Sequence, residues 1–201
     1  MVTHKGIEVN LDQIKAINNL RTPRNPKEVQ KLTGMAAALN RFISRSADRC
    51  RPFFLLINKW KNFEWTEECA KAFQQLKDYL ARSPIMSSPE PDEVLFAYIA
   101  VAPYAVSLVL IRVDNGIQRP VYYVNKSLHE VEMRYLPLDK AILAVVLGTR
   151  KLPYYFQAHT VVVLTQLPFK TIFRSADYTG RIAKWVQFWG LLTLNTCPVP
   201  P

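Results

Sequence analysis

Val94-Leu-Phe-Ala-Tyr-Ile-Ala-Val101 is the first of four apolar runs that decide the fold. It is followed by Ala105-Val-Ser-Leu-Val-Leu-Ile-Arg112, by Pro120-Val-Tyr-Tyr-Val124 and, after a helical segment, by Thr160-Val-Val-Val-Leu164. Short apolar runs that are rich in β-branched and aromatic residues predict strands. The order is therefore βββαβ, which predicts an α/β (α+β) fold with a mixed sheet and flanking helices.

The connections between these runs fit the same order. Asn115-Gly116 is a typical hairpin turn between the second and third strands. Residues 138–152 are expected to form the helix and to turn four side chains toward the sheet: Ile142, Val145, Val146 and Thr149. Residues 167–174 and 180–189 are expected to form short helices that close the fold.

The composition indicates a globular and basic chain. Its 201 residues are 49% hydrophobic, the net charge is +10, and the isoelectric point is near 9.6. A basic surface favours polyanions, of which nucleic acid is the commonest, although a generally basic soluble protein is the alternative. Cys50, Cys69 and Cys197 show no paired spacing and are expected to be reduced thiols. No run is long enough for a transmembrane helix and the N-terminus lacks a signal-peptide pattern, so we expect an intracellular protein, in the cytoplasm or the nucleus, without a membrane partner.

Three helices are expected before the apolar runs. Residues 11–20 form the first, and two prolines end it. The second begins at Asn25 as cap, with Pro26 and Glu28 behind it, and buries one face: Val29, Leu32, Ala36, Leu39 and Ile43. The third is capped by Thr66 and buries Cys69, Ala72, Phe73, Leu76 and Leu80. Between them lies an aromatic-rich connection, in which Trp60 and Trp65, like Phe73, are expected to pack in the core rather than to stack on bases.

Basic residues on the outer faces of the second helix are the candidate nucleic-acid contacts. They are Lys27, Lys31, Arg41 and Arg45, and Arg24 and Lys126 complete the candidate set. Cations that neutralise phosphates give an affinity that depends on salt and not on sequence. A solvated helix face is the alternative interpretation.

Several segments resemble one known family. They are Phe63-Glu-Trp-Thr-Glu-Glu-Cys69, Phe73-Gln-Gln-Leu-Lys77 and Tyr122-Tyr-Val-Asn-Lys-Ser-Leu128, in which Asn125 replaces a serine of the family. They resemble the reverse transcriptase/ribonuclease H region of gypsy-type LTR retrotransposon polyproteins, above all those of plants. The resemblance implies that residues 1–82 are the end of the palm hairpin followed by thumb and connection helices, that 83–92 are a proline-rich linker, and that 93–189 are a ribonuclease H-like domain.

The family's chemistry requires carboxylates that hold Mg²⁺, and the resemblance implies that this chain lacks them. Its three catalytic positions fall on Ala100, Ala141 and Gln166, which carry no charge. The other nearby acids, Asp114, Asp139 and Asp177, are not expected to compensate. We therefore expect a catalytically inactive ribonuclease H-like domain with no cofactor.

The resemblance also concerns what the sequence does not contain. The family's polymerase motif, Tyr-x-Asp-Asp, is absent, so the polymerase palm is expected to belong to a part of the parent polyprotein outside this sequence. Residues 190–201 depart from the family pattern and are expected to be a disordered tail, with a frame-shifted reading as the hypothesis for its origin.

The expected function is the binding of an RNA–DNA hybrid or another nucleic-acid duplex by a retrotransposon-derived fragment. Two alternatives stay open. One is an active ribonuclease or part of an RNA-directed DNA polymerase, and the other is a non-enzymatic protein interaction module.

Overall fold

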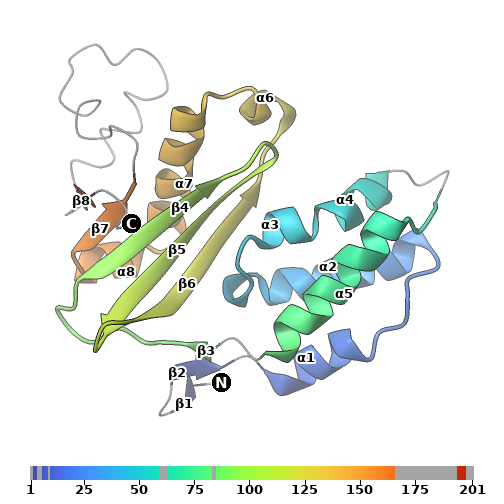
Figure 1. The fold of residues 1–201 in the computed structure, drawn as a ribbon, viewed down its shortest axis with the longest axis horizontal. Coiled ribbons are helices and arrows are strands. Elements are labelled where there is room, and N and C mark those ends of the chain that lie inside the picture. The colour runs from blue at the N-terminus through green and yellow to red at the C-terminus, as the bar shows by residue number, and fades with distance from the viewer. Residues whose placement is uncertain are drawn as a thin grey trace.

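A computed structural model describes residues 2–3, 6–8, 10–58, 63–82, 85–165 and 194–197. Two parts pack side by side, a helical module of residues 11–81 and a βββαβ unit of residues 95–164 (Figure 1). Each part has a hydrophobic core of its own. None of the described helices combines the length and the apolar character needed to cross a bilayer.

The described part of the helical module contains five α-helices and one 3-10 helix: α1 (Leu11–Asn18), α2 (Pro26–Ala38), η1 (Asn40–Phe42), α3 (Ser46–Arg49), α4 (Arg51–Asn58) and α5 (Glu67–Ala81). The predicted caps are confirmed. The side chain of Asn25 accepts from the backbone N–H of Glu28 at 3.0 Å, and that of Thr66 accepts from Cys69 at 3.3 Å. These bonds satisfy amides that the first turn of a helix leaves without partners.

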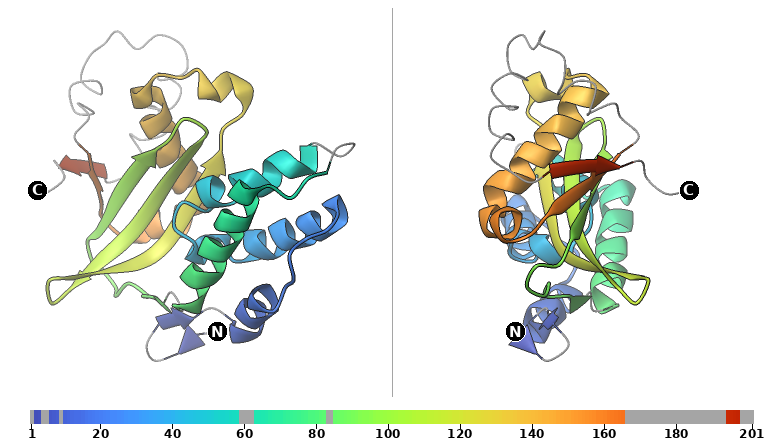
Figure 2. Two further views of the ribbon diagram at one scale, coloured as in Figure 1. Left: turned by 45° about the vertical axis from the view of Figure 1, so that its right-hand side comes forward. Right: turned by 90° about the vertical axis from the view of Figure 1, so that its left-hand side faces the viewer.

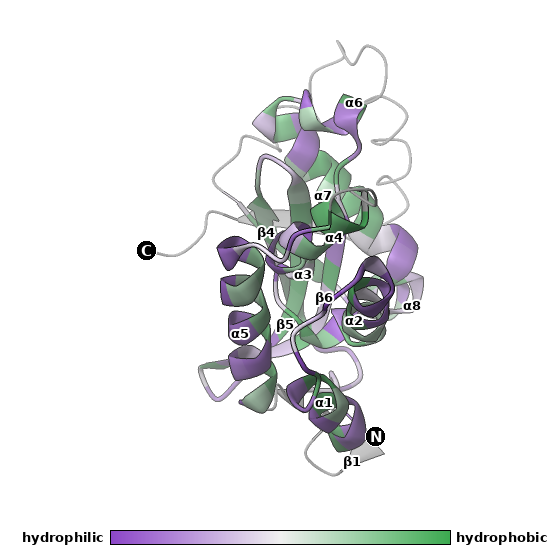
Figure 3. Cartoon of the chain, turned by 90° about the vertical axis from the view of Figure 1, so that its right-hand side faces the viewer, coloured by the Kyte–Doolittle hydropathy of each residue, from purple (hydrophilic) through white to green (hydrophobic). Residues whose placement is uncertain are grey.

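The buried faces of α2 and α5 follow the apolar spacing. All ten predicted core positions are buried: Val29, Leu32, Ala36, Leu39, Ile43, Cys69, Ala72, Phe73, Leu76 and Leu80. In Figure 3, α5 is hydrophilic on one side and hydrophobic on the other. The ring of Phe53 stacks on that of Trp65 at 5.9 Å, and Phe73 meets both rings edge-on. The prediction that Trp65 and Phe73 pack in the core is confirmed, whereas Trp60 lies outside the described residues.

Two details of the helical module differ from the sequence prediction. The second helix ends at Ala38, because the carbonyls of Asn40 and Ile43 accept hydrogen bonds from the sheet instead of continuing the helix. Arg41 and Arg45 therefore do not share a helix face with the lysines of α2, and that prediction is wrong. The aromatic-rich connection also contains a helix, α4, whose inner face carries Phe53 and Leu56, three positions apart, and continues the spacing of Cys50 just before the helix.

The sheet of the βββαβ unit has the order β6-β5-β4-β7-β8. Its strands are β4 (Leu95–Val101), β5 (Ala105–Asp114), β6 (Ile117–Ser127), β7 (Val161–Leu164) and β8 (Leu194–Cys197). β5 is antiparallel to both β4 and β6, and β7 is parallel to β4. Asn115 and Gly116 have positive φ angles of 50° and 80°, as a two-residue hairpin turn requires. The predicted βββαβ order is confirmed.

Helix α7 (Pro137–Lys151) covers one face of this sheet, between α6 (Glu130–Met133) and α8 (Pro153–Ala158). The four side chains predicted to face the sheet, Ile142, Val145, Val146 and Thr149, are all buried. Gly148 allows the helix to approach β5 closely, since a Cβ at this position would lie 3.0 Å from Cδ1 of Leu108.

The helical module contacts the opposite face of the sheet through η1 and α3, which pack on β6 (Figure 2). Successive side chains of a strand point to opposite faces. Alternate residues of β6 therefore pack in two different cores, the core under α7 and the core of the helical module. Val124 packs in the α7 core, whereas Tyr123 packs against the core of the helical module. Burial and the neighbouring Tyr79 raise the pKa of Tyr123 to about 12.

A second, small sheet joins the beginning of the chain to the connection between the two parts. Its strands are β1 (Val2–Thr3), β2 (Gly6–Glu8) and β3 (Ile85–Met86), all antiparallel. The predicted linker, residues 83–92, thus contains a strand, and Met86 is fully buried in the core of the helical module.

The end of the chain is only partly described. Leu194–Cys197 form β8, which pairs in parallel with β7. The prediction of a disordered tail is therefore wrong at these four residues, because a free edge of the sheet offers hydrogen bonds that the sequence pattern does not reveal. The helices predicted at 167–174 and 180–189 lie outside the described residues.

Candidate nucleic-acid interface

The entry to α2 presents three of the predicted cations to solvent. Arg24, Lys27 and Lys31 are exposed, and none of them has an acidic partner among the ion pairs of the described residues. Glu28 fixes the backbone here, because its carboxylate accepts from the N–H of Arg24 at 2.7 Å. Lys27 and Lys31 lie one turn apart, and Gly34 follows one turn later. The result is a basic ridge made of Arg24, Lys27 and Lys31.

Gly34 leaves the backbone of α2 uncovered next to this basic ridge. It is exposed, and a Cβ added to it would meet nothing within 4 Å. A glycine inside an exposed helix costs about 1 kcal/mol relative to alanine, so it usually has a packing or a functional reason. Among the described residues nothing packs on this position, and the functional reason that a glycine permits is a close approach of a ligand to the backbone.

Arg41 is not part of the basic ridge. Its guanidinium stacks between two rings, 5.1 Å from the centre of Phe42 and 4.9 Å from that of Tyr122. Its Nε is buried and has no hydrogen-bond partner in the part of the chain that the structure describes. Arg41 therefore joins η1 to β6 rather than facing a ligand freely.

Arg45 and Lys126 are each engaged with an acid. Arg45 has a left-handed backbone, with a φ of 52°, and pairs with Asp48 at 3.1 Å. Lys126 forms a close ion pair with Glu132 of α6. The structure thus brings together only three of the six predicted cations, and it assigns structural contacts to the other three.

Further basic residues, which the sequence analysis did not single out, also act within the fold. Arg49 lies over the ring of Tyr79 at 4.7 Å and Arg51 over that of Tyr104 at 3.6 Å. Lys77 donates to two carbonyls at the end of α1, that of its last residue, Asn18, and that of Leu20. The formal net charge of +10 therefore overstates how many basic side chains are free to bind a nucleic acid.

The resemblance assigns the family's carboxylate positions to Ala100, Ala141 and Gln166, and the two of them that the structure describes do not lie together. Ala141 is 1% exposed and packs in the α7 core. Ala100 follows Ile99, which packs on α7, so strand alternation turns Ala100 to the opposite face. The sheet therefore separates these two positions. Gln166 lies outside the described residues.

No other carboxylate of the described residues replaces them. β4 contains no acid, and the single acid of α7, Asp139, lies in its first turn. Asp114 pairs with Arg119 at 3.1 Å. The described part of the chain contains no cluster of three or more acidic, histidine or cysteine residues that could hold a metal ion. Mg²⁺ requires oxygen ligands, which alanine side chains cannot supply, so the described residues do not fit a two-metal centre.

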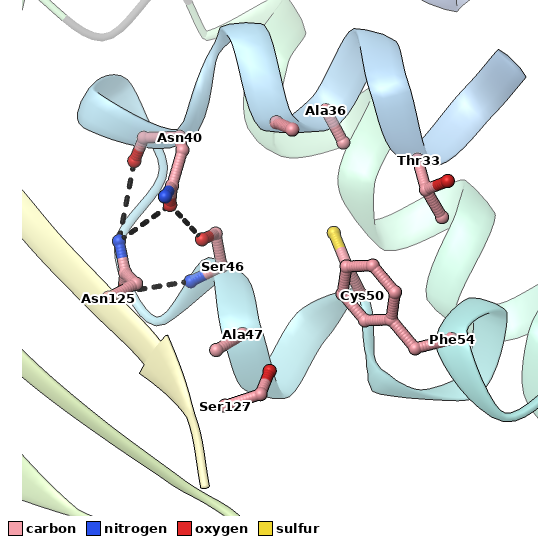
Figure 4. Close-up of a pocket in the computed structure, with 10 residues that line it drawn as sticks. Thr33, Ala36, Asn40, Ser46, Ala47, Cys50, Phe54, Asn125 and Ser127 are labelled. Atoms are coloured by element: carbon pink, nitrogen blue, oxygen red, sulfur yellow. Dashed lines mark hydrogen bonds between the residues drawn. The ribbon is translucent and has the colours of Figure 1, made fainter. Parts of the chain in front are cut away.

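A cavity of about 200 Å³ lies where the helical module meets β6 (Figure 4). Its walls include Ala36, Ala47 and Cys50 from the helices and Asn125 and Ser127 from the strand. Burial raises the pKa of the Cys50 thiol to about 11, which favours the protonated thiol at neutral pH. Cys50 and Cys69 are both free thiols, as predicted, and the side chain of Cys197 is outside the described part.

Comparison with known proteins agrees with this architecture. Residues 65–163, from two residues before α5 through most of β7, match the model of the RNase H-like domain found in reverse transcriptase. These residues belong to that family. The match includes the last helix of the helical module, so the RNase H-like domain and that module are linked in sequence as well as in space.

Curated relatives of the RNase H-like domain and its helical module are polyproteins of transposons. The chain is 24% identical to the retrovirus-related Pol polyprotein from transposon 297 of Drosophila melanogaster over 92% of its own length. It is 22% identical to the transposon Tf2-3 polyprotein of Schizosaccharomyces pombe over 90%. The chain spans only 17% and 13% of the lengths of these relatives.

Solved structures with the same fold come from foamy viral protease-reverse transcriptase. The structure in complex with an RNA/DNA hybrid matches 98% of this chain and 28% of its own, with a TM-score of 0.80 and 16% identity. A structure with double-stranded DNA matches 100% of this chain and 36% of its own, also with a TM-score of 0.80 and 16% identity. Residues 65–163 are thus an RNase H-like domain of the reverse transcriptase kind, in a chain whose curated relatives are transposon polyproteins and whose structural neighbours are solved with nucleic acid.

Proposed function

We propose that this chain binds duplex nucleic acid, foremost an RNA–DNA hybrid, and that its RNase H-like domain does not cleave it. One observation carries the proposal: β4 and the sheet-facing side of α7 offer no carboxylate where a two-metal nuclease requires them, while the basic ridge stays free. Two-metal hydrolysis needs anionic ligands to hold the ions that activate water. Neutral side chains cannot replace these ligands.

The basic ridge and Gly34 support binding to the backbone of a duplex. Lys27 and Lys31 are one helical turn apart and can neutralise successive phosphates, while Gly34 lets the helix lie close to the groove. Foamy viral reverse transcriptases of the same fold are solved with a hybrid and with double-stranded DNA. In this proposal the helical module acts as a thumb-like grip and the RNase H-like domain as a spacer.

The same proposal has a protein partner. The helical module would pack beside a polymerase palm of the parent polyprotein, as the thumb region that it resembles does. The relatives are several times longer than this chain, which leaves room for such a palm.

Binding is tested by fluorescence anisotropy with a labelled RNA–DNA hybrid at several salt concentrations. We expect the logarithm of the association constant to fall linearly with the logarithm of salt concentration, because phosphate contacts release counterions. Affinity that does not depend on salt would contradict the proposal and would favour the protein interaction module.

Inactivity is tested by incubating the same hybrid with the full chain and Mg²⁺. We expect no cleavage above a control without protein. Cleavage that needs Mg²⁺ and disappears in Asp139→Asn or Asp177→Asn would show that these acids complete a metal site, and the proposed inactivity would be wrong.

A further inference from the structure

The contact between the helical module and the RNase H-like domain centres on one buried amide. Asn125 of β6 is 4% exposed. Its Oδ1 accepts from the backbone N–H of Ser46 at 3.1 Å. Its Nδ2 donates to Oδ1 of Asn40 at 3.1 Å and to two carbonyl oxygens, those of Asn40 at 3.3 Å and of Ile43 at 3.1 Å. Figure 4 shows the bonds to Asn40 and Ser46 spanning the gap between strand and helices.

Apolar packing does not fill the junction at this point. The cavity of about 200 Å³ lies directly beside Asn125, with Ala36, Ala47 and Cys50 on its helical side. Protein interiors are normally close-packed, and close packing fixes how two parts sit on each other. Because the cavity interrupts that packing, van der Waals contacts at this point do not by themselves prevent the two parts from shifting. Hydrogen bonds are directional, and a buried network of them specifies one arrangement.

We infer that Asn125 is a positioning residue that holds the helical module in one orientation on the RNase H-like domain. An amide is required because it both accepts and donates at one position. A serine, which the resembling family has here, is too short for the same bonds, and an aspartate would set a carboxylate against two carbonyl oxygens. This role goes beyond nucleic-acid binding and does not depend on it.

Loss of Asn125 should open the junction without separating the two parts. Tyr123, two residues earlier on β6, still packs against the core of the helical module. Arg41 still stacks on Tyr122. We therefore expect a local opening on the side of the cavity.

Two buried cysteines distinguish a local opening from global unfolding. Cys50 lines the cavity and is 3% exposed, whereas Cys69 is 2% exposed in α5 and does not line it. Opening of the junction exposes Cys50 alone, while global unfolding exposes both thiols. The readout is the ratio of their labelling rates with a chromogenic aromatic disulfide.

The measurement uses the full chain in two backgrounds. Cys69→Ala with Cys197→Ala leaves Cys50, and Cys50→Ala with Cys197→Ala leaves Cys69. We expect Asn125→Ala to raise the ratio of the Cys50 rate to the Cys69 rate at least about tenfold, which corresponds to about 1.4 kcal/mol in the opening equilibrium. An unchanged ratio would overturn the inference, because Asn125 would then contribute only to global stability.

Asn125→Asp separates hydrogen bonding from shape, since the two side chains have the same size. We expect Asn125→Asp to raise the ratio of the Cys50 rate to the Cys69 rate at neutral pH, as Asn125→Ala does. A ratio equal to that of the chain with Asn125 would also overturn the inference. Gln118→Ala is the matched control, since Gln118 lies on the exposed part of β6 and its side chain bonds only to the hydroxyl of Tyr98 among the described residues. The labelling needs no nucleic acid, so the result stands even if the proposed hybrid binding fails.

Discussion

The guanidinium of Arg41 lies 4.9 Å from the centre of the Tyr122 ring and so connects the helical module to β6. A cation over an aromatic face gains about 0.5–1 kcal/mol at exposed sites and more when water is excluded. The charge of Arg41 is therefore used inside the protein. Its contact with an aromatic ring distinguishes Arg41 from the exposed Lys27 and Lys31, although the spacing in the sequence had predicted one common helix face for all three.

Neutralising a lysine of the basic ridge should change the salt dependence of hybrid binding. We expect Lys27→Gln and Lys31→Gln each to weaken binding and to reduce the salt slope by about 1, since each removes one phosphate contact. Arg41→Gln should leave the slope unchanged and lower the free energy of unfolding by about 1 kcal/mol. Anisotropy titrations and urea denaturation measure both quantities. A slope reduced by Arg41→Gln as much as by Lys31→Gln would place Arg41 at the phosphates.

Gly34 should tolerate a side chain in the free protein but not in the complex. We expect Gly34→Ala to stabilise the fold by up to about 1 kcal/mol through its higher helix propensity. Gly34→Leu should keep the fold and lower hybrid affinity by about tenfold, because the side chain separates the helix from the duplex. Ala70→Leu, on the exposed side of α5, is the matched control. Equal affinities for the two leucine variants would show that no ligand approaches Gly34.

A carboxylate at position 141 should destabilise the fold rather than restore a metal site. Burial disfavours the charged form, so an introduced glutamate has a folded-state pKa above its unfolded value of about 4.3. Relative to the neutral control Ala141→Gln, the stability of Ala141→Glu should be equal below about pH 4. It should then fall by about 1.4 kcal/mol per pH unit as the pH rises toward the folded-state pKa. Urea denaturation at several pH values measures this difference, and a stability restored by Mg²⁺ would reveal ligands beyond the described residues.

The ion pair between Lys126 and Glu132 should make part of the stability pH-dependent. Partial burial disfavours the carboxylate of Glu132, but hydrogen bonds from Lys126 and from the backbone of His129 outweigh it and hold the pKa of Glu132 below its ordinary value. A lowered pKa contributes stability that is present above the unfolded pKa of about 4.3 and is lost as the pH falls through the folded-state value.

Glu132→Gln should therefore cost about 1 kcal/mol at neutral pH and less in acid. Thermal or urea unfolding across the pH range measures it. Lys126→Gln should show the same loss at neutral pH and leave the salt slope of hybrid binding unchanged. A pH-independent cost of Glu132→Gln would mean that the ion pair contributes nothing to stability.

The amino-acid sequence by itself determined the elements and their inner faces. Caps at Asn25 and Thr66, the turn at Asn115-Gly116 and the buried sides of α2, α5 and α7 all follow from local spacing, because a helix or strand presents its side chains with a fixed period. The same spacing did not predict α4 or β8, whose stability comes from neighbours that are distant in the sequence.

Only the tertiary structure decided which charged and polar groups are free. Lys31 and Arg41 have the same character in the sequence, but one faces solvent and the other stacks on a strand more than 80 residues away. In the sequence, Asn125 is notable only because it replaces a serine of the resembling family. In the fold, its side chain forms the hydrogen bonds between β6 and the helical module. The physical reason is that the partner of a side chain is set by which elements pack together, whereas the period of an element is set by its own backbone.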